Sequence, residues 1–356
     1  MIYQHPSNSE IILRFFQQRL AFKLSKKVIY TVALLVFCIT LNTIWSLFTG
    51  SYYLSSGQVI SIIFNQQPMS AENNIIWLFR FPRTLAAILV GMMMALSGAV
   101  LQNITRNSLA DPSLVGISQG AALTVVFVIV VFPEVDQSYR SMLAFLGSVT
   151  VTGLILFLSH SKKNNKPIRF ILLGIALSAF LSAITTAYLT YGQLYQASVA
   201  LGWLAGNIDG ANWQDVKVLF YSSLCLLPIL LILSREMAVI RLGDTTAIVL
   251  GGNLDIAKYS LIAIAVALAA TATSVVGPIG FIGLIAPHAA RRLCHSGVAS
   301  HLLVSAFIGG LLLLFSDILG RRLIAPSQLP AGILTQIIGV PIFVYLLLHR
   351  QTRSHL

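Results

Sequence analysis

Long apolar runs separated by short polar stretches fill the chain from about residue 28 to residue 348. A bilayer core needs roughly 20 apolar residues per helix. Lipid offers no partner to backbone polar groups, and the alternating pattern of a β-barrel strand is absent, so the spans are expected to be helices. The pattern predicts an all-α polytopic membrane protein with about ten spans, near residues 28–49, 84–104, 114–132, 142–159, 169–191, 214–233, 257–276, 279–290, 302–320 and 331–348.

Composition supports this assignment and indicates one domain. Of the residues, 56% are hydrophobic and 10% are charged, with a mean hydropathy of +0.84. A soluble domain carries about a quarter charged residues. No linker or charged block divides the apolar region, so we expect a single membrane domain over residues 28–350. Residues 1–27 are expected to form a cytoplasmic N-terminal segment, since no small-residue cleavage site follows the first apolar run.

The positive charges predict the orientation. With the N-terminal segment inside and ten alternating spans, inside segments hold 17 of the 23 Lys and Arg residues. This bias follows the positive-inside rule, so both termini are expected on the cytoplasmic side of the membrane, and the basic charge requires no nucleic acid. The outside residues are Arg80, Arg83, Arg140, Lys217, Arg321 and Arg322.

Three segments outside the spans carry further expectations. Residues 192–213 are expected outside, with a short interfacial helix. Residues 234–256 are expected inside, polar yet half apolar. The stretch 11–24 is amphipathic and fits either a helix on the inner surface or a disordered tail.

The chain lacks an energy source of its own. The nearest approach to a P-loop, Gly252–Tyr259, has Ala257 in place of the second glycine and a tyrosine where Mg²⁺ needs a Ser or Thr hydroxyl. An ion-coupled carrier usually buries several ionisable groups mid-membrane. Here Asp317 lies inside a span with Arg321 at i+4, which favours a local ion pair over a proton relay.

Catalytic and metal-binding signatures are also missing. There is no HExxH, no GxSxG and no CxxC, and Cys38, Cys225 and Cys294 are far apart. His288 and His295 are two helical turns apart, too far for an i, i+4 chelate pair. We therefore expect neither an enzyme nor a metal site, and any metal that is carried should arrive already chelated.

Several motifs resemble one family. They are FRFPRTLAAILVG (79–91), SGAVLQNITRNSLADPSLVGISQGA (97–121), LLGIALSA (172–179), LGDTTAIVLG (242–251), GPIGFIGLIAPHAARR (277–292), SDILGRR (316–322) and LPAGILTQIIGVPIFVYLLL (329–348). In this order, from about residue 50 to 350, the chain resembles the FecCD-type permeases. These are membrane subunits of bacterial importers for iron–siderophores, haem and vitamin B12.

The resemblance implies a type II ABC importer permease fold of ten spans. It implies a dimer with a second permease copy or a paralogue, two cytoplasmic ATPase subunits that hold ATP and Mg²⁺, and an extracytoplasmic substrate-binding protein. No cofactor is implied in this chain. The expected function is ATP-driven import of a ferric siderophore by alternating access. Haem or vitamin B12 import on the same architecture, or an ion-coupled secondary carrier, are the alternatives.

The loop at 234–256 is the first candidate site. The family uses this loop to couple to the ATPase. Gly243 is expected to break two short helical pieces, and the next residue sits where a carboxylate caps a helix. An ordinary amphipathic surface loop is the alternative. The coupling residues are expected to be Leu242, Gly243, Asp244, Ala247, Leu250 and Gly251.

Arg80, Arg83 and Arg321 match family arginines that pair with acidic residues of the binding protein. A planar guanidinium takes a carboxylate in bidentate fashion. Snorkelling towards lipid headgroups is the alternative, and the role of Arg322 stays open.

The turn between spans two and three is the third candidate, because in the family it helps to close the inner end of the path. A plain connecting turn is an equal alternative. Its residues are Asn107, Ser108, Leu109 and Ala110. In the segment between spans four and five, Pro167 and Ile168 depart from the expected small hydroxyl residues, so no gate role is assigned there. Glycines at 277, 280 and 283 fit either close helix packing or a broken helix, and close packing is the expectation.

Overall fold

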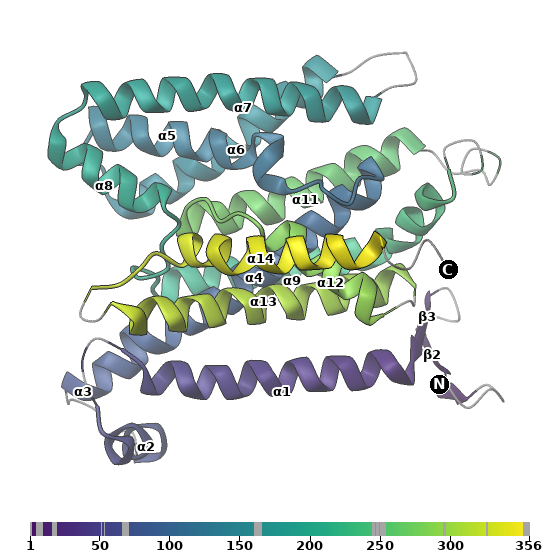
Figure 1. Ribbon diagram of the computed structural model, residues 1–356, viewed down its shortest axis with the longest axis horizontal. Coiled ribbons are helices and arrows are strands. Elements are labelled where there is room, and N and C mark those ends of the chain that lie inside the picture. The colour runs from purple at the N-terminus through teal and green to yellow at the C-terminus, as the bar shows by residue number, and fades with distance from the viewer. Residues whose placement is uncertain are drawn as a thin grey trace.

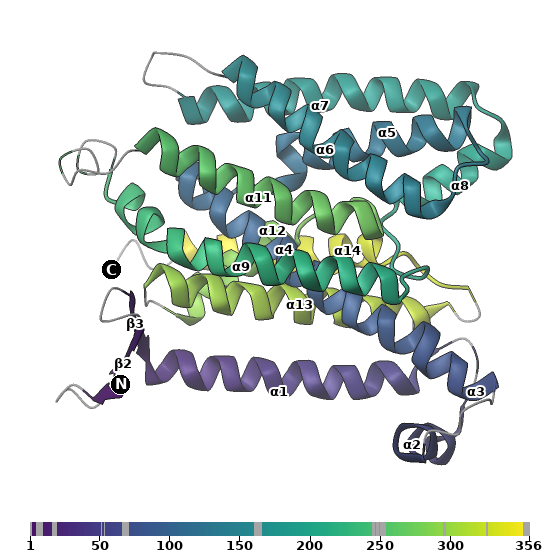
Figure 2. The ribbon, with the colours of Figure 1, turned by 180° about the vertical axis from the view of Figure 1, so that it is seen from behind.

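The computed structural model describes residues 2–4, 10–15, 20–50, 52, 54–65, 71–159, 166–243, 246, 249, 254–294, 297–324 and 327–351. They form a bundle of helices that run along the long axis of the molecule (Figure 1). Helix α1, Lys26–Phe48, lies along one edge, and α7, Lys166–Tyr191, lies along the opposite edge. Between these edges α4, Phe81–Thr105, crosses the middle of the bundle (Figure 2).

Every predicted span coincides with a helix, and the helical membrane fold is confirmed. Seven stretches of described helix are long and apolar enough to cross a membrane, and two more are shorter apolar helices. The Gly- and Pro-rich eighth span is a helix of 12 residues. The remaining span helices are α5 (Ile117–Val131), α6 (Gln137–Ser159), α9 (Trp213–Arg241), α11 (Leu254–Val276), α12 (Ile282–Leu293), α13 (Val298–Leu323) and α14 (Ala331–Gln351).

The N-terminal segment differs from both expectations for residues 11–24. It forms an antiparallel sheet of order β1-β2-β3 (Ile2–Gln4, Glu10–Phe15, Leu20–Ser25), in which Leu13 pairs with Phe22. The helix and the disordered tail are therefore wrong for the described part. Isoleucine and phenylalanine favour strands, and cross-strand partners override a weak helical periodicity. Ser25 then caps α1, because its hydroxyl accepts from Val28 N at 3.3 Å.

Short elements join the long helices. The expected helix within 192–213 is α8, Leu194–Leu204. Sequence patterns had not indicated α2 (Ser56–Asn65), α3 (Ala71–Asn74), the π-helix η1 (Ile75–Arg80) or the 3₁₀ turn η2 (Pro112–Val115).

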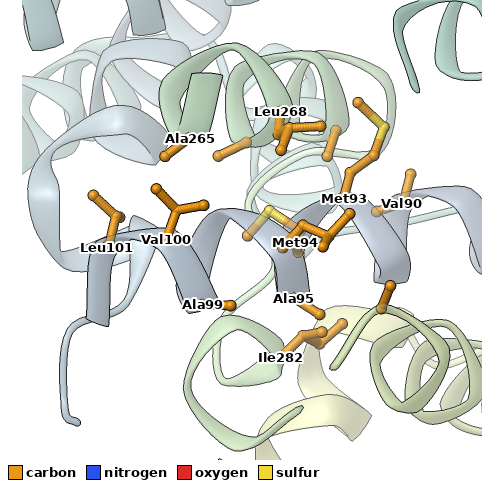
Figure 3. Packing of buried hydrophobic residues seen from close by; sticks show 14 of the residues in the cluster. Val90, Met93, Met94, Ala95, Ala99, Val100, Leu101, Ala265, Leu268 and Ile282 are labelled. Atoms are coloured by element: carbon orange, nitrogen blue, oxygen red, sulfur yellow. The ribbon is translucent and has the colours of Figure 1, made fainter. Parts of the chain in front are cut away.

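The hydrophobic core is built around α4. Met93 and Val100 face Ala265 and Leu268 of α11, while Ala95 faces Ile282 of α12 (Figure 3). These side chains are buried, so α4 is covered on several sides by other helices. The arrangement explains why α4 is apolar around its whole circumference, with no amphipathic stripe.

Glycine lets the helices approach α4 closely. A Cβ added at Gly98 would lie 2.0 Å from the carbonyl oxygen of Gly283, and one added at Gly91 would lie 2.3 Å from that of Gly309. The prediction of close packing is thus confirmed for Gly283. It is wrong for Gly280, where an added Cβ meets nothing within 4 Å.

The two ends of the bundle differ. We call the end that carries α2 and α8 the α8 end, and the end that carries β2 and the last turn of α14 the β2 end (Figures 1 and 2). β2 and the last turn of α14 lie at the same end, as an even number of crossings requires. The candidate site residues divide between the two ends.

Candidate functional site

At the α8 end, one buried carboxylate holds two arginines. Arg83, from the first turn of α4, donates from Nε to Asp317 Oδ1 at 2.9 Å. Arg321 lies one turn after Asp317 on α13, and its Nη2 is 2.9 Å from Asp317 Oδ2. The side chain of Asp317 is 1% exposed. The predicted i, i+4 ion pair is confirmed, and Arg83 is an additional partner that sequence spacing did not reveal.

A second carboxylate reaches Arg83 from the loop between α8 and α9. Arg83 Nη1 donates to Asp209 Oδ1 and, at 2.6 Å, to Gln328 Oε1. The side chain of Asp209 is 49% exposed. Arg83 thus forms ion pairs with one buried and one half-exposed carboxylate.

The other guanidinium groups bind the last turn of α1 and the residues after it. Arg80 donates to the carbonyl oxygens of Leu47 and Tyr52, each at 2.6 Å. Arg321 Nη1 donates to the carbonyl oxygen of Thr49 at 3.0 Å. The bonds to Leu47 and Thr49 satisfy carbonyl groups that the end of α1 leaves open. The arginines therefore join α1, α4 and α13.

These three arginines are more buried than is usual for charged residues in a segment outside the spans. Arg80, Arg83 and Arg321 are 5%, 6% and 3% exposed. Groups so enclosed do not snorkel to headgroups, since their guanidinium donors are directed into the chain. All three nevertheless line one pocket of about 220 Å³, together with Asp209 and Gln328. Their docking role stays a prediction, and the pocket is the route by which a partner carboxylate would reach them.

The loop that carries Asp209 is fixed by neighbouring loops. Asn207 N donates to the carbonyl oxygen of Val276 at 2.8 Å, and Gly332 N donates to that of Gly206 at 2.9 Å. Gly206 has φ +73°, and an added Cβ would lie 2.5 Å from the carbonyl oxygen of Pro278. Only glycine fits such a position. The Asp209 backbone N–H then binds Asn207 Oδ1 at 3.0 Å.

At the β2 end, the turn after α4 is stabilised by its own residues. Arg106 ends α4 with φ +51°, and its Nη2 donates to the carbonyl oxygen of Ile240 at 2.9 Å. Asn107 Oδ1 accepts from Leu109 N at 2.9 Å. Leu109 is exposed whereas Ala110 is buried. These contacts are those of an ordinary connecting turn. The gate role of Asn107, Ser108, Leu109 and Ala110 stays a prediction.

Asp111 is a structural residue that sequence reasoning missed. Its Oδ1 accepts from Ser113 N at 2.8 Å and so caps η2. Its Oδ2 lies against the first turn of α12, because a Cβ added at Gly283 would be 3.1 Å from this oxygen. Burial raises the pKa of Asp111, and the hydrogen bonds from Ser113 oppose that rise. The LADPSLVG and GPIGFIGLIAPH motifs therefore meet in space, and an Asp before Pro was the available signal.

A large basic cavity also opens at the β2 end. Its volume is about 700 Å³, and four arginines line it together with His288, three amide side chains and Ser108. None of the described residues that line it is acidic. Arg241 donates to Asn103 Oδ1, and Arg291 donates to Gln102 Oε1. From the sequence alone, Arg291 and Arg292 count only among the 17 Lys and Arg residues of the inside segments. The arginines are Arg106, Arg241, Arg291 and Arg292.

The candidate coupling loop is described only at its start. α9 ends at Arg241, Leu242 is exposed, and Gly243 has φ +114°. The left-handed Gly243 follows the C-cap residue of α9, as is usual where a helix ends. The helical piece expected after Gly243 lies largely outside the described residues, so the break between two pieces stays a prediction. Asp244, Ala247, Leu250 and Gly251 lie outside the described residues, so the coupling role stays a prediction.

Comparison with known proteins gives consistent matches over most of the chain. The model of the FecCD transport family matches residues 34–349. The Fe(3+)-citrate import system permease protein YfmE of Bacillus subtilis (strain 168) is 39% identical over 322 residues, which cover 90% of this chain and 96% of that protein. The Fe(3+) dicitrate transport system permease protein FecD of Escherichia coli (strain K12) is 37% identical over 269 residues, 76% of this chain and 83% of that protein.

A solved structure agrees with these relatives. It is an inward-facing conformation of a metal-chelate type ABC transporter, with a TM-score of 0.80 and 28% sequence identity. The superposition covers 89% of this chain and 98% of that chain. Sequence and fold therefore give the same relationship along nearly the whole length of both proteins.

Proposed function

Because the chain belongs to the FecCD transport family, we propose that it is the membrane permease subunit of an ATP-driven importer for a ferric chelate. The observation that carries this proposal is the match in sequence and fold along almost the full length of a metal-chelate ABC transporter chain. The two relatives named above carry Fe(3+)-citrate or Fe(3+) dicitrate in their names. An iron chelate, of the citrate or siderophore kind, is thus a better supported substrate than haem or vitamin B12.

The proposed assembly has its energy source outside this chain. Two ATPase subunits would bind ATP and Mg²⁺ on the cytoplasmic side, beneath two permease copies or this chain and a paralogue. Support comes from the family and from the sequence around Gly252, which lacks the glycine and hydroxyl residues of a P-loop. The chain itself then requires no cofactor and catalyses no reaction.

In this proposal the β2 end faces the cytoplasm of the bacterium. Four arginines gather there around one cavity, whereas the arginines at the α8 end are accompanied by Asp209 and Asp317. That asymmetry follows the positive-inside rule. Reporter fusions near residue 165 and at the C-terminus are expected to signal cytoplasm, and one near residue 210 the outside. An outside signal at 165 would contradict ten spans.

Docking of the binding protein is proposed at the pocket lined by Arg80, Arg83 and Arg321. Three guanidinium groups line one pocket of about 220 Å³, and their charge suits the entry of an acidic side chain of a partner. Replacing all three by glutamate is expected to abolish binding. Because these arginines are buried, the loss counts against docking only in complexes whose basal ATPase activity shows correct assembly. Added salt should weaken the wild-type complex through screening.

Two further roles belong to the β2 end. The exposed Leu242 and the left-handed Gly243 suit a loop that inserts into a groove on the ATPase. The turn Asn107–Ala110 borders the basic cavity through Asn107 and Ser108. A turn at this position would open and close the inner end of the path as the ATPases cycle.

Uptake of labelled chelates tests the function directly. The permease is reconstituted with its ATPase in proteoliposomes and supplied with binding protein and ⁵⁵Fe-citrate, a ferric trihydroxamate, haem or cobalamin. Uptake of a ferric chelate that needs internal ATP and survives an ionophore is the expected result. Uptake driven by a proton or sodium gradient without ATP would instead establish the secondary carrier.

A further inference from the structure

The two carboxylates on Arg83 occupy very different surroundings. Asp317 lies on α13, is 1% exposed and is shared with Arg321. Asp209 lies on a loop, is 49% exposed, and its ion pair is with Arg83. A buried carboxylate between two guanidinium groups is part of the framework, since its removal leaves uncompensated charge. A half-exposed carboxylate on one of them can leave at small cost.

Asp209 lines the same pocket as the arginines, and its side chain is the half-exposed member of the Arg83 pair. Arg83 Nη1 is bonded to Asp209, while Arg83 Nε and Nη2 face Asp317. Nη1, the nitrogen of Arg83 that does not face Asp317, is thus already bonded to a carboxylate of its own chain. The contact has the same chemistry as the bond an acidic residue of a docked protein would make.

We propose that Asp209 is an internal stand-in for a carboxylate of the binding protein. It holds Arg83 while the α8 end is empty, and it releases that guanidinium group when an acidic side chain of the partner enters the pocket. This inference rests on the proposed docking function. Asp209 competes with the partner carboxylate for Arg83, so it lowers the affinity of the empty permease for the binding protein. It also keeps the guanidinium group of Arg83 oriented for the exchange of carboxylates.

The charge of the pocket explains why such a stand-in is useful. Three guanidinium groups line one small opening, and Asp317 compensates only part of their charge. The fixed loop keeps Asp209 within reach of Arg83, because Asn207 and Gly206 bind the ends of α11 and α14. Exchange of one carboxylate for another therefore needs movement of one side chain and no refolding of the loop.

Asp209→Asn removes the competitor and keeps the side-chain shape. An exposed ion pair of this kind corresponds to about a two- to fivefold change in an equilibrium constant. The assay uses the whole permease–ATPase complex in nanodiscs and measures the Kd of the loaded binding protein over a range of salt. The expected result is binding about two- to fivefold tighter than wild type, with a steeper salt dependence since one more positive charge is uncovered.

The matched control is Glu134→Gln, which removes an exposed negative charge in the turn between α5 and α6 at the same end of the bundle. General relief of repulsion would tighten both variants equally, and that outcome overturns the stand-in. Unchanged or weaker binding by Asp209→Asn overturns it too. Asp209→Glu restores the charge and should return the Kd towards wild type.

The triple change of Arg80, Arg83 and Arg321 to glutamate separates this inference from the docking proposal. If the triple variant still binds normally, the docking proposal itself fails. If the triple variant loses binding while Asp209→Asn behaves as wild type, docking stands and only the stand-in is refuted. Basal ATPase activity of each complex reports correct assembly.

Discussion

Removal of the shared carboxylate, Asp317→Ala, is the most informative single change at the α8 end. Both oxygens of Asp317 serve arginines, at 2.9 Å from Arg83 Nε and 2.9 Å from Arg321 Nη2. Without them, two guanidinium groups enclosed by protein face each other. Breaking one side of a buried ion pair costs about 3–5 kcal/mol. The exposed pair of Asp209 with the same Arg83 contributes about 1 kcal/mol or less.

Equilibrium unfolding in mixed micelles titrated with SDS measures both variants on one scale. Asp317→Ala is expected to lose about 3–5 kcal/mol of unfolding free energy, and Asp209→Asn about 1 kcal/mol or less. A second change, Arg321→Gln, should recover part of the loss when it is added to Asp317→Ala, since it removes one uncompensated charge. The expected coupling is about 1–3 kcal/mol. Equal, small losses of unfolding free energy for Asp317→Ala and Asp209→Asn would refute the structural role of the buried Asp317 ion pairs.

Other positions give sharp contrasts. Gly98→Ala places a Cβ 2.0 Å from the Gly283 carbonyl oxygen and should cost about 1–3 kcal/mol or more in the same titration, whereas Gly153→Ala, which meets nothing within 4 Å, should be neutral within about 0.5 kcal/mol. Gly243→Glu forces a side chain into φ +114°; uptake should be lost while membrane insertion and binding-protein affinity persist, and near-normal uptake would exclude the coupling role. Burial raises the pKa of Asp111 in the folded state above the value of 3.8 for a free carboxyl. The folded state therefore binds the proton more tightly than the unfolded chain, and wild type should lose unfolding free energy relative to Asp111→Asn as pH rises above about 4. A pH-independent difference would contradict the burial of that carboxyl.

Local patterns predicted the helices well because each apolar run is long and continuous. α9 and α13 follow from hydropathy alone, and the Asp317–Arg321 pair follows from helical spacing. The N-terminal sheet was missed because strand pairing between Leu13 and Phe22 depends on a partner, which a run of six residues does not reveal.

The candidate site depends on contacts that no local spacing encodes. Arg83 and Asp209 are 126 positions apart, and the basic cavity gathers arginines from α9, α12 and the turn after α4. The sequence indicated arginines at one end but not their burial. Solvent exposure of a guanidinium group depends on which loops fold over it, and here those loops are set by close glycine contacts such as that of Gly206.

The bond between Arg83 and Asp317 joins residues 234 positions apart, so it has a consequence for biosynthesis. At a synthesis rate of 5–20 residues per second, Asp317 emerges about 12 to 47 seconds after Arg83. For most of that interval α4 is in the membrane without α11, α12 and α13, which later pack against it. The helices made before α11 must therefore leave part of the α4 surface uncovered until α11, α12 and α13 pack against it. In a nascent chain truncated before α13, Arg83 would lack its buried partner. The Arg83–Asp317 ion pair therefore forms only after α13 has joined the bundle.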